Sequence, residues 1–162
     1  MPNQMLLFVS CLGRIAVIMS VLLGGSSLAC AESYIPWQVE NHAIPAALGG
    51  LKGDPRRGRQ IAIDRSKGNC LACHHLPVPE EEFHGTVGPP LEGVGLRLSA
   101  GQIRLRIVDE KQVNPMTIMP GFYRDPRYFD RVLDDYEGKT ILTAQEVEDI
   151  VAYLLTLREV SE

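Results

Sequence analysis

The chain has 162 residues, of which 45% are hydrophobic and 22% charged, and its formal net charge is −4 at pH 7. This length suits one domain, and the mildly acidic balance argues against a nucleic-acid partner. No internal repeat or low-complexity segment is visible.

The first 31 residues have the pattern of a secretory signal peptide. Arg14 is the only charged residue before position 32, and the apolar run 15–24 precedes Ala29-Cys30-Ala31, an A-x-A cleavage site. We therefore expect export to the periplasm and cleavage after Ala31. The apolar run is short for a membrane span, so we expect none in the mature form. Two alternatives stay open, which are lipidation of Cys30 and retention of the segment as an uncleaved anchor.

Residues 32–53 show little periodicity and predict an irregular arm. Pro36, Pro45 and the pair Gly49-Gly50 all oppose regular structure here. Trp37 is the only tryptophan of the chain, and Tyr34 and Ile35 lie close to it. We expect the arm to pack on the surface of its own domain, on a partner subunit, or on both.

Asp54-Pro55 predicts the start of a helix over residues 55–64, because Asp caps helices well and Pro suits the first helical position. Gly58 lies inside this helix at a cost of about 1 kcal/mol relative to Ala. Such a glycine is either a tolerated imperfection or a place where another helix comes close.

Cys70-Leu71-Ala72-Cys73-His74 is a C-x-x-C-H motif, the attachment signature of a c-type haem. Two thiols at this spacing can reach the two vinyl groups of one porphyrin, and the following histidine becomes the proximal iron ligand. A thioredoxin-like pair or half of a zinc site also uses C-x-x-C. The only other cysteines, Cys11 and Cys30, lie in the expected signal peptide, which disfavours zinc.

The rest of the chain predicts two further helices and no β-sheet. Residues 75–98 are rich in Pro and Gly and predict a long loop, which would wrap the porphyrin. Capping boxes at Ser99-x-x-Gln102 and Thr143-x-x-Glu146 begin helices that extend to about residues 110 and 157. The last helix has an apolar stripe, and its opposite face carries Glu148, Asp149 and Arg158. We expect an all-α domain with the haem as much of its core.

The sixth ligand of the iron decides between electron transfer and ligand chemistry. Met116 and Met119 both lie in the loop 114–120, and Met119 is followed by Pro120, which stiffens the loop. Met119 is therefore the better candidate, while Met116 and His84 stay open. His75 follows the proximal His74 directly and is expected to point elsewhere, toward solvent or a propionate.

The order of these motifs resembles that of class I cytochromes c. The resemblance implies thioether bonds at Cys70 and Cys73, with His74 as the proximal ligand and Met119 as the distal one. It implies that Pro89, in the element Gly88-Pro89-Pro90-Leu91, offers its carbonyl to the far nitrogen of His74. It also implies that Gly58 meets the last helix near Tyr153. On this basis residues 54–162 form the cytochrome c domain, and no residue of the chain is catalytic.

Longer strings resemble the SoxX family of monohaem cytochrome subunits. They are residues 53–59, residues 67–74, the ligand loop 114–123 and the approach to the last helix, 138–148. The resemblance implies a periplasmic partner of the SoxA type, which holds the catalytic cysteine in that family. The SoxAX complex joins thiosulfate to a carrier-protein cysteine, an L-cysteine S-thiosulfotransferase reaction. The implied role is electron relay, with a downstream cytochrome as acceptor.

Three other functions stay open. A free-standing electron carrier for a terminal oxidase would be a monomer without a tight partner. A haem enzyme, such as a peroxidase or a thiosulfate dehydrogenase, would need an open or labile sixth position on the iron. A ligand-sensing haem protein would show the same open iron without turnover.

Overall fold

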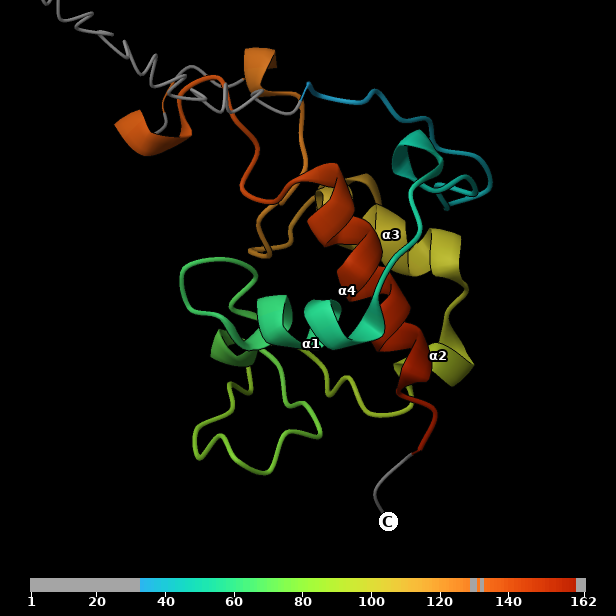
Figure 1. The fold of residues 1–162 in the computed structure, drawn as a ribbon, viewed down its shortest axis with the longest axis vertical. Coiled ribbons are helices and arrows are strands. Elements are labelled where there is room, and N and C mark those ends of the chain that lie inside the picture. Colours follow the sequence, from blue (N-terminus) through green and yellow to red (C-terminus); the bar gives the residue numbers. More distant parts are fainter. Residues whose placement is uncertain (1–32, 129–130, 132, 160–162) are drawn as a thin grey trace, which may run out of the picture. The chain divides into compact units, whose positions relative to one another are not determined.

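The computed structural model describes residues 33–128, 131 and 133–159. The expected signal peptide, with Cys11 and Cys30, lies outside these residues. Within these described residues there are four α-helices, α1 (Pro55–Ile63), α2 (Val94–Arg97), α3 (Ala100–Asp109) and α4 (Ala144–Thr156) (Figure 1). Single 3-10 turns lie at Leu48–Gly50, Cys70–Ala72, Glu110–Gln112, Pro126–Tyr128 and Asp134–Tyr136. The described residues contain no β-strand, only an isolated bridge between Glu40 and Ala43, so the predicted all-α class is confirmed.

The three longer helices begin where their capping residues predict. The Asp54 carboxylate accepts from the N–H groups of Arg56 and Arg57, and Pro55 is the first helical residue of α1. Both predicted capping boxes are formed, by Ser99 with Gln102 and by Thr143 with Glu146. The short helix α2 was not predicted, because Gly93 precedes it, Gly95 lies inside it and its N-terminus has no side-chain cap. It interrupts the loop expected over residues 75–98.

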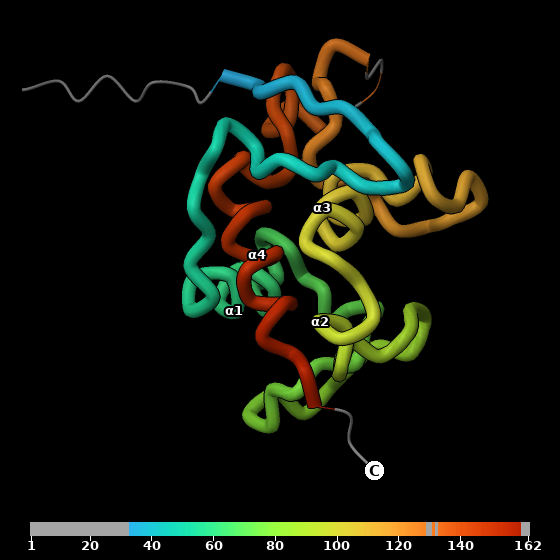
Figure 2. The backbone as a smooth tube through the Cα atoms, turned by 90° about the vertical axis from the view of Figure 1, so that its right-hand side faces the viewer, coloured from blue at the N-terminus to red at the C-terminus, as the bar shows by residue number. Residues whose placement is uncertain are grey.

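Gly58 marks the closest approach of α1 to α4. A β-carbon at Gly58 would lie 1.9 Å from the carbonyl oxygen of Asp149 and 2.9 Å from the backbone nitrogen of Ile150. Only a glycine allows two helix backbones to pass at this distance. The close-approach interpretation of Gly58 is therefore right, but its predicted place near Tyr153 is wrong by one helical turn. Figures 1 and 2 show the two helices side by side from directions at right angles.

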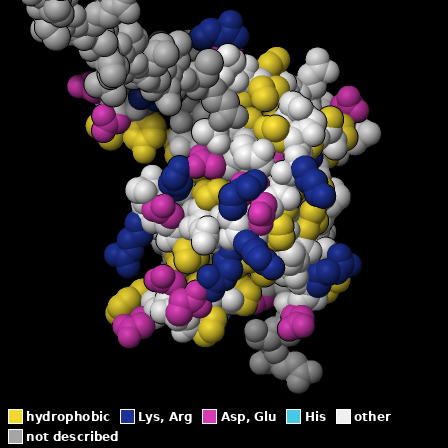
Figure 3. All heavy atoms as spheres, in the orientation of Figure 1, with side chains coloured by type: hydrophobic (Ala, Val, Ile, Leu, Met, Phe, Trp, Pro, Cys, Tyr) yellow, Lys and Arg dark blue, Asp and Glu magenta, His cyan; other side chains and the backbone are white. Residues whose placement is uncertain are grey.

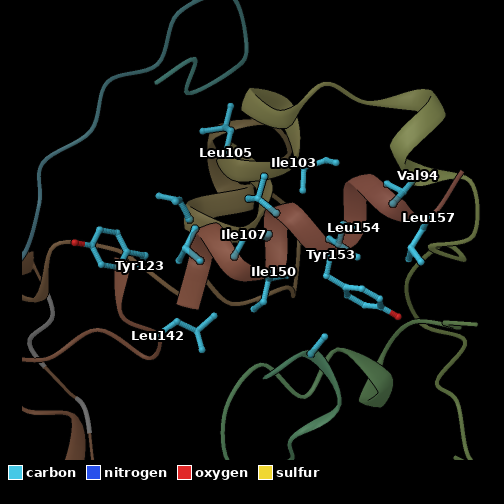
Figure 4. Close-up of a cluster of buried hydrophobic side chains, with 14 of the residues drawn as sticks. Val94, Ile103, Leu105, Ile107, Tyr123, Leu142, Ile150, Tyr153, Leu154 and Leu157 are labelled. Atoms are coloured by element: carbon cyan, nitrogen blue, oxygen red, sulfur yellow. The ribbon is translucent and has the colours of Figure 1, made fainter. Parts of the chain in front are cut away.

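The apolar core lies between α3 and α4, with contributions from α2 and from the segments beside Tyr123 and Leu142 (Figure 4). The stripe predicted on α4 is buried, and α3 presents Ile103 and Ile107 to it. The largest fully buried side chain of the core is that of Tyr123, which is 2% exposed.

Two of the charged residues opposite the apolar stripe, Glu148 and Asp149, are also buried, whereas Arg158 is exposed. The two acidic residues are 3% and 1% exposed. Arg104 of α3 donates to both carboxylate oxygens of Glu148, at 2.7 and 2.8 Å. Burial alone would raise the pKa of Asp149, but hydrogen bonds from Arg57, the Asp54 N–H and Gln145 leave it below its usual value. Buried charges with such partners are stable, and no hydropathy pattern reveals those partners.

The arm packs against its own domain. Ile44 and Leu48 are buried in the core, at 3% and 2% exposure. The Leu48 N–H donates to Glu148, and the Ile44 carbonyl accepts from Arg104, at 2.9 and 2.7 Å. The expected packing of the arm on its own domain is therefore confirmed, and packing on a partner subunit stays a prediction.

Candidate haem site

The C-x-x-C-H motif forms a tight turn that is separated from the end of α1 by six residues. Residues Cys70–Ala72 are a 3-10 turn, and the N–H groups of Cys73 and His74 both donate to the Cys70 carbonyl, at 3.1 and 2.9 Å. Asn69 precedes the turn with φ 45°, a left-handed conformation that reverses the chain. The two thiols and the imidazole therefore all belong to one compact turn of five consecutive residues.

The two thiols are not joined by a disulfide. Burial raises the pKa of the Cys70 thiol to about 12, so this group is a neutral thiol at physiological pH. A redox-active C-x-x-C pair depends on a stabilised thiolate. The burial of Cys70 therefore disfavours the thioredoxin-like alternative.

The ring of His74 is oriented by the loop that follows the motif. Its Nδ1 lies 2.7 Å from the Pro89 carbonyl oxygen. A carbonyl only accepts, so Nδ1 carries the proton and Nε2 has its lone pair available for a metal. This is the contact that the class I resemblance implies for Pro89.

Gly88 makes this contact possible. A β-carbon at Gly88 would lie 2.3 to 2.8 Å from the Cε1, Nδ1 and Nε2 atoms of His74. Gly85 lies equally close to the motif, since a β-carbon there would be 2.2 Å from the Ala72 carbonyl oxygen. Both glycines let the loop lie directly against the motif.

Backbone hydrogen bonds and one arginine fix this loop. The N–H groups of residues 85, 88 and 91 donate to the carbonyls of residues 71, 73 and 75, at 2.7, 2.8 and 2.9 Å. Arg97 of α2 donates to the carbonyls of Glu92 and Pro90, at 2.5 and 3.0 Å. No sequence pattern indicates this role of Arg97, because the residue lies in a short helix that has no capping signal.

The two other histidines near the motif have partners of their own. His75 Nδ1 forms a hydrogen bond with the carboxylate of the buried Glu92, and the centroid of its ring lies 4.5 Å from that of His84. His84 Nδ1 accepts from the Leu76 N–H at 3.3 Å, so Nε2 is protonated and donates to the Glu81 carbonyl at 3.0 Å. Both nitrogens of His84 are therefore engaged, which leaves the methionines as the better candidates for a sixth ligand.

The loop 114–120 holds its two methionines differently. Met116 is 86% exposed, whereas Met119 is half-buried. The Met119 N–H donates to the Thr117 hydroxyl at 3.1 Å, and the ammonium of Lys111 donates to the Thr117 carbonyl at 3.0 Å. Thr117 therefore orders the backbone around Met119, a role that no motif in the sequence indicates.

These residues fit a c-type haem. Two unpaired thiols, an imidazole with Nε2 available and a thioether on a hydrogen-bonded loop are the donor set that such a haem requires. The glycines against the motif complete a cradle that larger residues would fill. Among the described residues, no group of three or more His, Cys, Asp or Glu side chains could hold a metal ion by itself.

The comparisons with known proteins agree with this donor set. A family model described as cytochrome c matches residues 55–158. The chain belongs to the cytochrome c family. It is also similar to a solved chain, "Crystal structure of SoxXA from P. pantotrophus", with 37% identity and a TM-score of 0.71, covering 79% of this cytochrome and 99% of that chain. A search of curated proteins found no match.

These matches confirm the prediction of a SoxX-type monohaem cytochrome that relays electrons, and of one covalently attached haem c. Within the part of the cytochrome that the structure describes, no helix is both long and apolar enough to span a membrane. On the face shown in Figure 3, Lys and Arg side chains are interspersed with Asp and Glu. That face offers no continuous basic surface to a polyanion.

Gly88→Ala is expected to disturb the proximal side of the site. The new methyl group overlaps the His74 ring, so the ring or the loop must shift and the bond to Pro89 is lost. Overpacking of this kind costs about 1–3 kcal/mol of stability. Losing the bond also makes the imidazole a weaker donor, which raises the reduction potential.

Urea unfolding and a redox titration check this expectation. Thr86→Ala, an exposed position in the same loop, is the control and should leave both quantities unchanged. A Gly88→Ala protein with the stability and potential of the parent would contradict the role assigned to Gly88.

Proposed function

We propose that the cytochrome holds its haem through Cys70 and Cys73, with His74 and Met119 as axial ligands. The observation that carries this proposal is the hydrogen bond from His74 Nδ1 to the Pro89 carbonyl. It leaves Nε2 available beside two unpaired thiols. Haem iron with His and Met ligands is a one-electron carrier of raised potential. Two protein ligands close the iron to substrates, which favours relay over catalysis.

The partner is a cytochrome subunit of the SoxA type. The solved structure with 37% identity is titled as a SoxXA complex, and it is matched over 99% of its chain. In the reaction implied by the family, a carrier cysteine loses its proton, a disulfide bond forms to thiosulfate, and two electrons leave. The expected mature chain has no cysteine besides Cys70 and Cys73, so its part is to accept those electrons singly and pass them to a downstream cytochrome.

The place of this reaction is the periplasm. Residues 1–31 act as the export signal, residues 32–53 form the arm and residues 54–162 form the cytochrome c domain. Export supports the assignment because haem is attached to c-type cytochromes outside the cytoplasm, and because cleavage removes Cys11 and Cys30.

The test is rapid mixing of the oxidised haem-loaded cytochrome with thiosulfate and the reduced carrier protein, with and without the SoxA-type subunit. We expect its haem to be reduced only when that subunit is present, and the two chains to elute together in size-exclusion chromatography. Reduction at an equal rate without the subunit would make this chain an enzyme. Failure of the chains to associate would favour the free-standing carrier.

A further inference from the structure

The chain returns to α3 immediately after Met119. The Phe122 N–H donates to the Ile107 carbonyl at 3.0 Å, and the Tyr123 N–H donates to the Val108 carbonyl at 3.2 Å. Only Pro120 and Gly121 separate Met119 from this attachment. A movement of the methionine away from the site must be absorbed by those two residues or must release Phe122 and Tyr123.

Tyr123 is held from its other side by the start of the arm. Its hydroxyl accepts from the Ile35 N–H at 2.7 Å, and its carbonyl accepts from the Trp37 indole N–H at 3.2 Å. The ring of Tyr34 stacks on that of Tyr123, with centroids 5.2 Å apart and planes 24° from parallel. Three residues of the arm therefore contact one buried residue that lies four positions after Met119.

The far end of the same arm is fixed to the helices. The Ile44 N–H donates to the Gly101 carbonyl at the start of α3, at 3.0 Å. The Ile44 carbonyl and the Leu48 N–H bond to the buried pair of Arg104 and Glu148. Figure 2 shows the arm, in blue, crossing near α3 and running beside the orange segment that follows the methionine loop. With both ends attached, the arm cannot follow a moving Tyr123 without breaking contacts.

We propose that residues 33–48 are a strap that holds the distal methionine loop closed, and that the Tyr123 hydroxyl is a positioning group for Met119. The proposal rests on the proposed function, in which Met119 is the sixth ligand. A thioether ligand competes with external ligands, and its competitiveness depends on how firmly its loop is held. Contacts made only when the loop is closed therefore lower the affinity of the iron for an external ligand.

The test is imidazole binding to the oxidised haem-loaded protein, followed as loss of the weak sulfur-to-iron charge-transfer band at the red end of the spectrum. Tyr123→Phe removes the acceptor of the Ile35 N–H and keeps the ring. We expect it to bind imidazole about tenfold more tightly, the equivalent of about 1.4 kcal/mol. Trp37→Phe removes the indole N–H and should shift the affinity in the same direction, which keeps the test valid if Tyr123→Phe does not fold.

Tyr128→Phe is the matched control, because Tyr128 is 76% exposed in the same part of the chain, and it should bind imidazole like the parent. An imidazole affinity within twofold of the parent in both Tyr123→Phe and Trp37→Phe would overturn the proposal, even if unfolding by urea showed a loss of stability. A parent protein without the charge-transfer band would instead overturn Met119 ligation, and the strap with it.

Discussion

Met119→Ala is expected to abolish the sulfur-to-iron charge-transfer band and to open the iron to carbon monoxide and imidazole. An alanine has no thioether, and the hydrogen bonds around Thr117 then hold a loop without a ligand. The reduction potential should fall, because methionine ligation raises it. Optical spectra of the oxidised and reduced protein, with and without carbon monoxide, measure the loss of the band and the opening of the iron. A redox titration measures the fall in potential.

Met116→Ala is the control for this substitution. Met116 lies in the same loop but is 86% exposed, so its removal should change stability by no more than about 0.5 kcal/mol and leave the spectra as in the parent. The reverse pattern, with the band lost in Met116→Ala and kept in Met119→Ala, would move the ligand to Met116.

Arg104→Ala is expected to cost about 3–5 kcal/mol of folding free energy. The side chains of Arg104 and Glu148 are 5% and 4% exposed, so the substitution leaves a buried carboxylate without its counter-charge. It also removes the donor to the Ile44 carbonyl and so loosens the arm. Urea unfolding of the haem-loaded protein measures the loss.

Two variants keep this measurement specific. Arg106→Ala removes a partly exposed arginine of the same helix, 3.8 Å from Glu110, and should cost at most about 1 kcal/mol. The double variant Arg104→Met with Glu148→Leu removes both charges and should recover part of the loss, because the Leu48 N–H and the Ile44 carbonyl still lose their partners. A single Arg104→Ala protein within about 1 kcal/mol of the parent would show that the pair contributes little.

Local signals predict much of the fold and of the haem motif. The caps at Asp54, Ser99 and Thr143 depend on residues within three positions of one another, so the sequence alone identifies the starts of α1, α3 and α4. The spacing of Cys70, Cys73 and His74 is equally local. Pro89 was expected from the resemblance, and its carbonyl does accept from His74.

The long-range contacts could not be predicted in this way. The hydrogen bonds from the arm to Tyr123 span 86 to 88 positions, and nothing near Trp37 in the sequence identifies that partner. Glu148 and Asp149 have the polarity of a solvent face, and only the packing of Arg104 and Arg57 against α4 explains their burial. The crossing point of Gly58 depends on the register between two helices, which the pattern of each helix leaves undetermined.

The most direct test of the central claim is the optical spectrum of the exported haem-loaded protein, oxidised and reduced, before and after carbon monoxide. We predict that the charge-transfer band is present in the oxidised protein and that carbon monoxide leaves the reduced spectrum unchanged. This result means that the iron is closed by His74 and a methionine. A missing band with ready carbon monoxide binding would contradict the account and favour catalysis or sensing at an open iron.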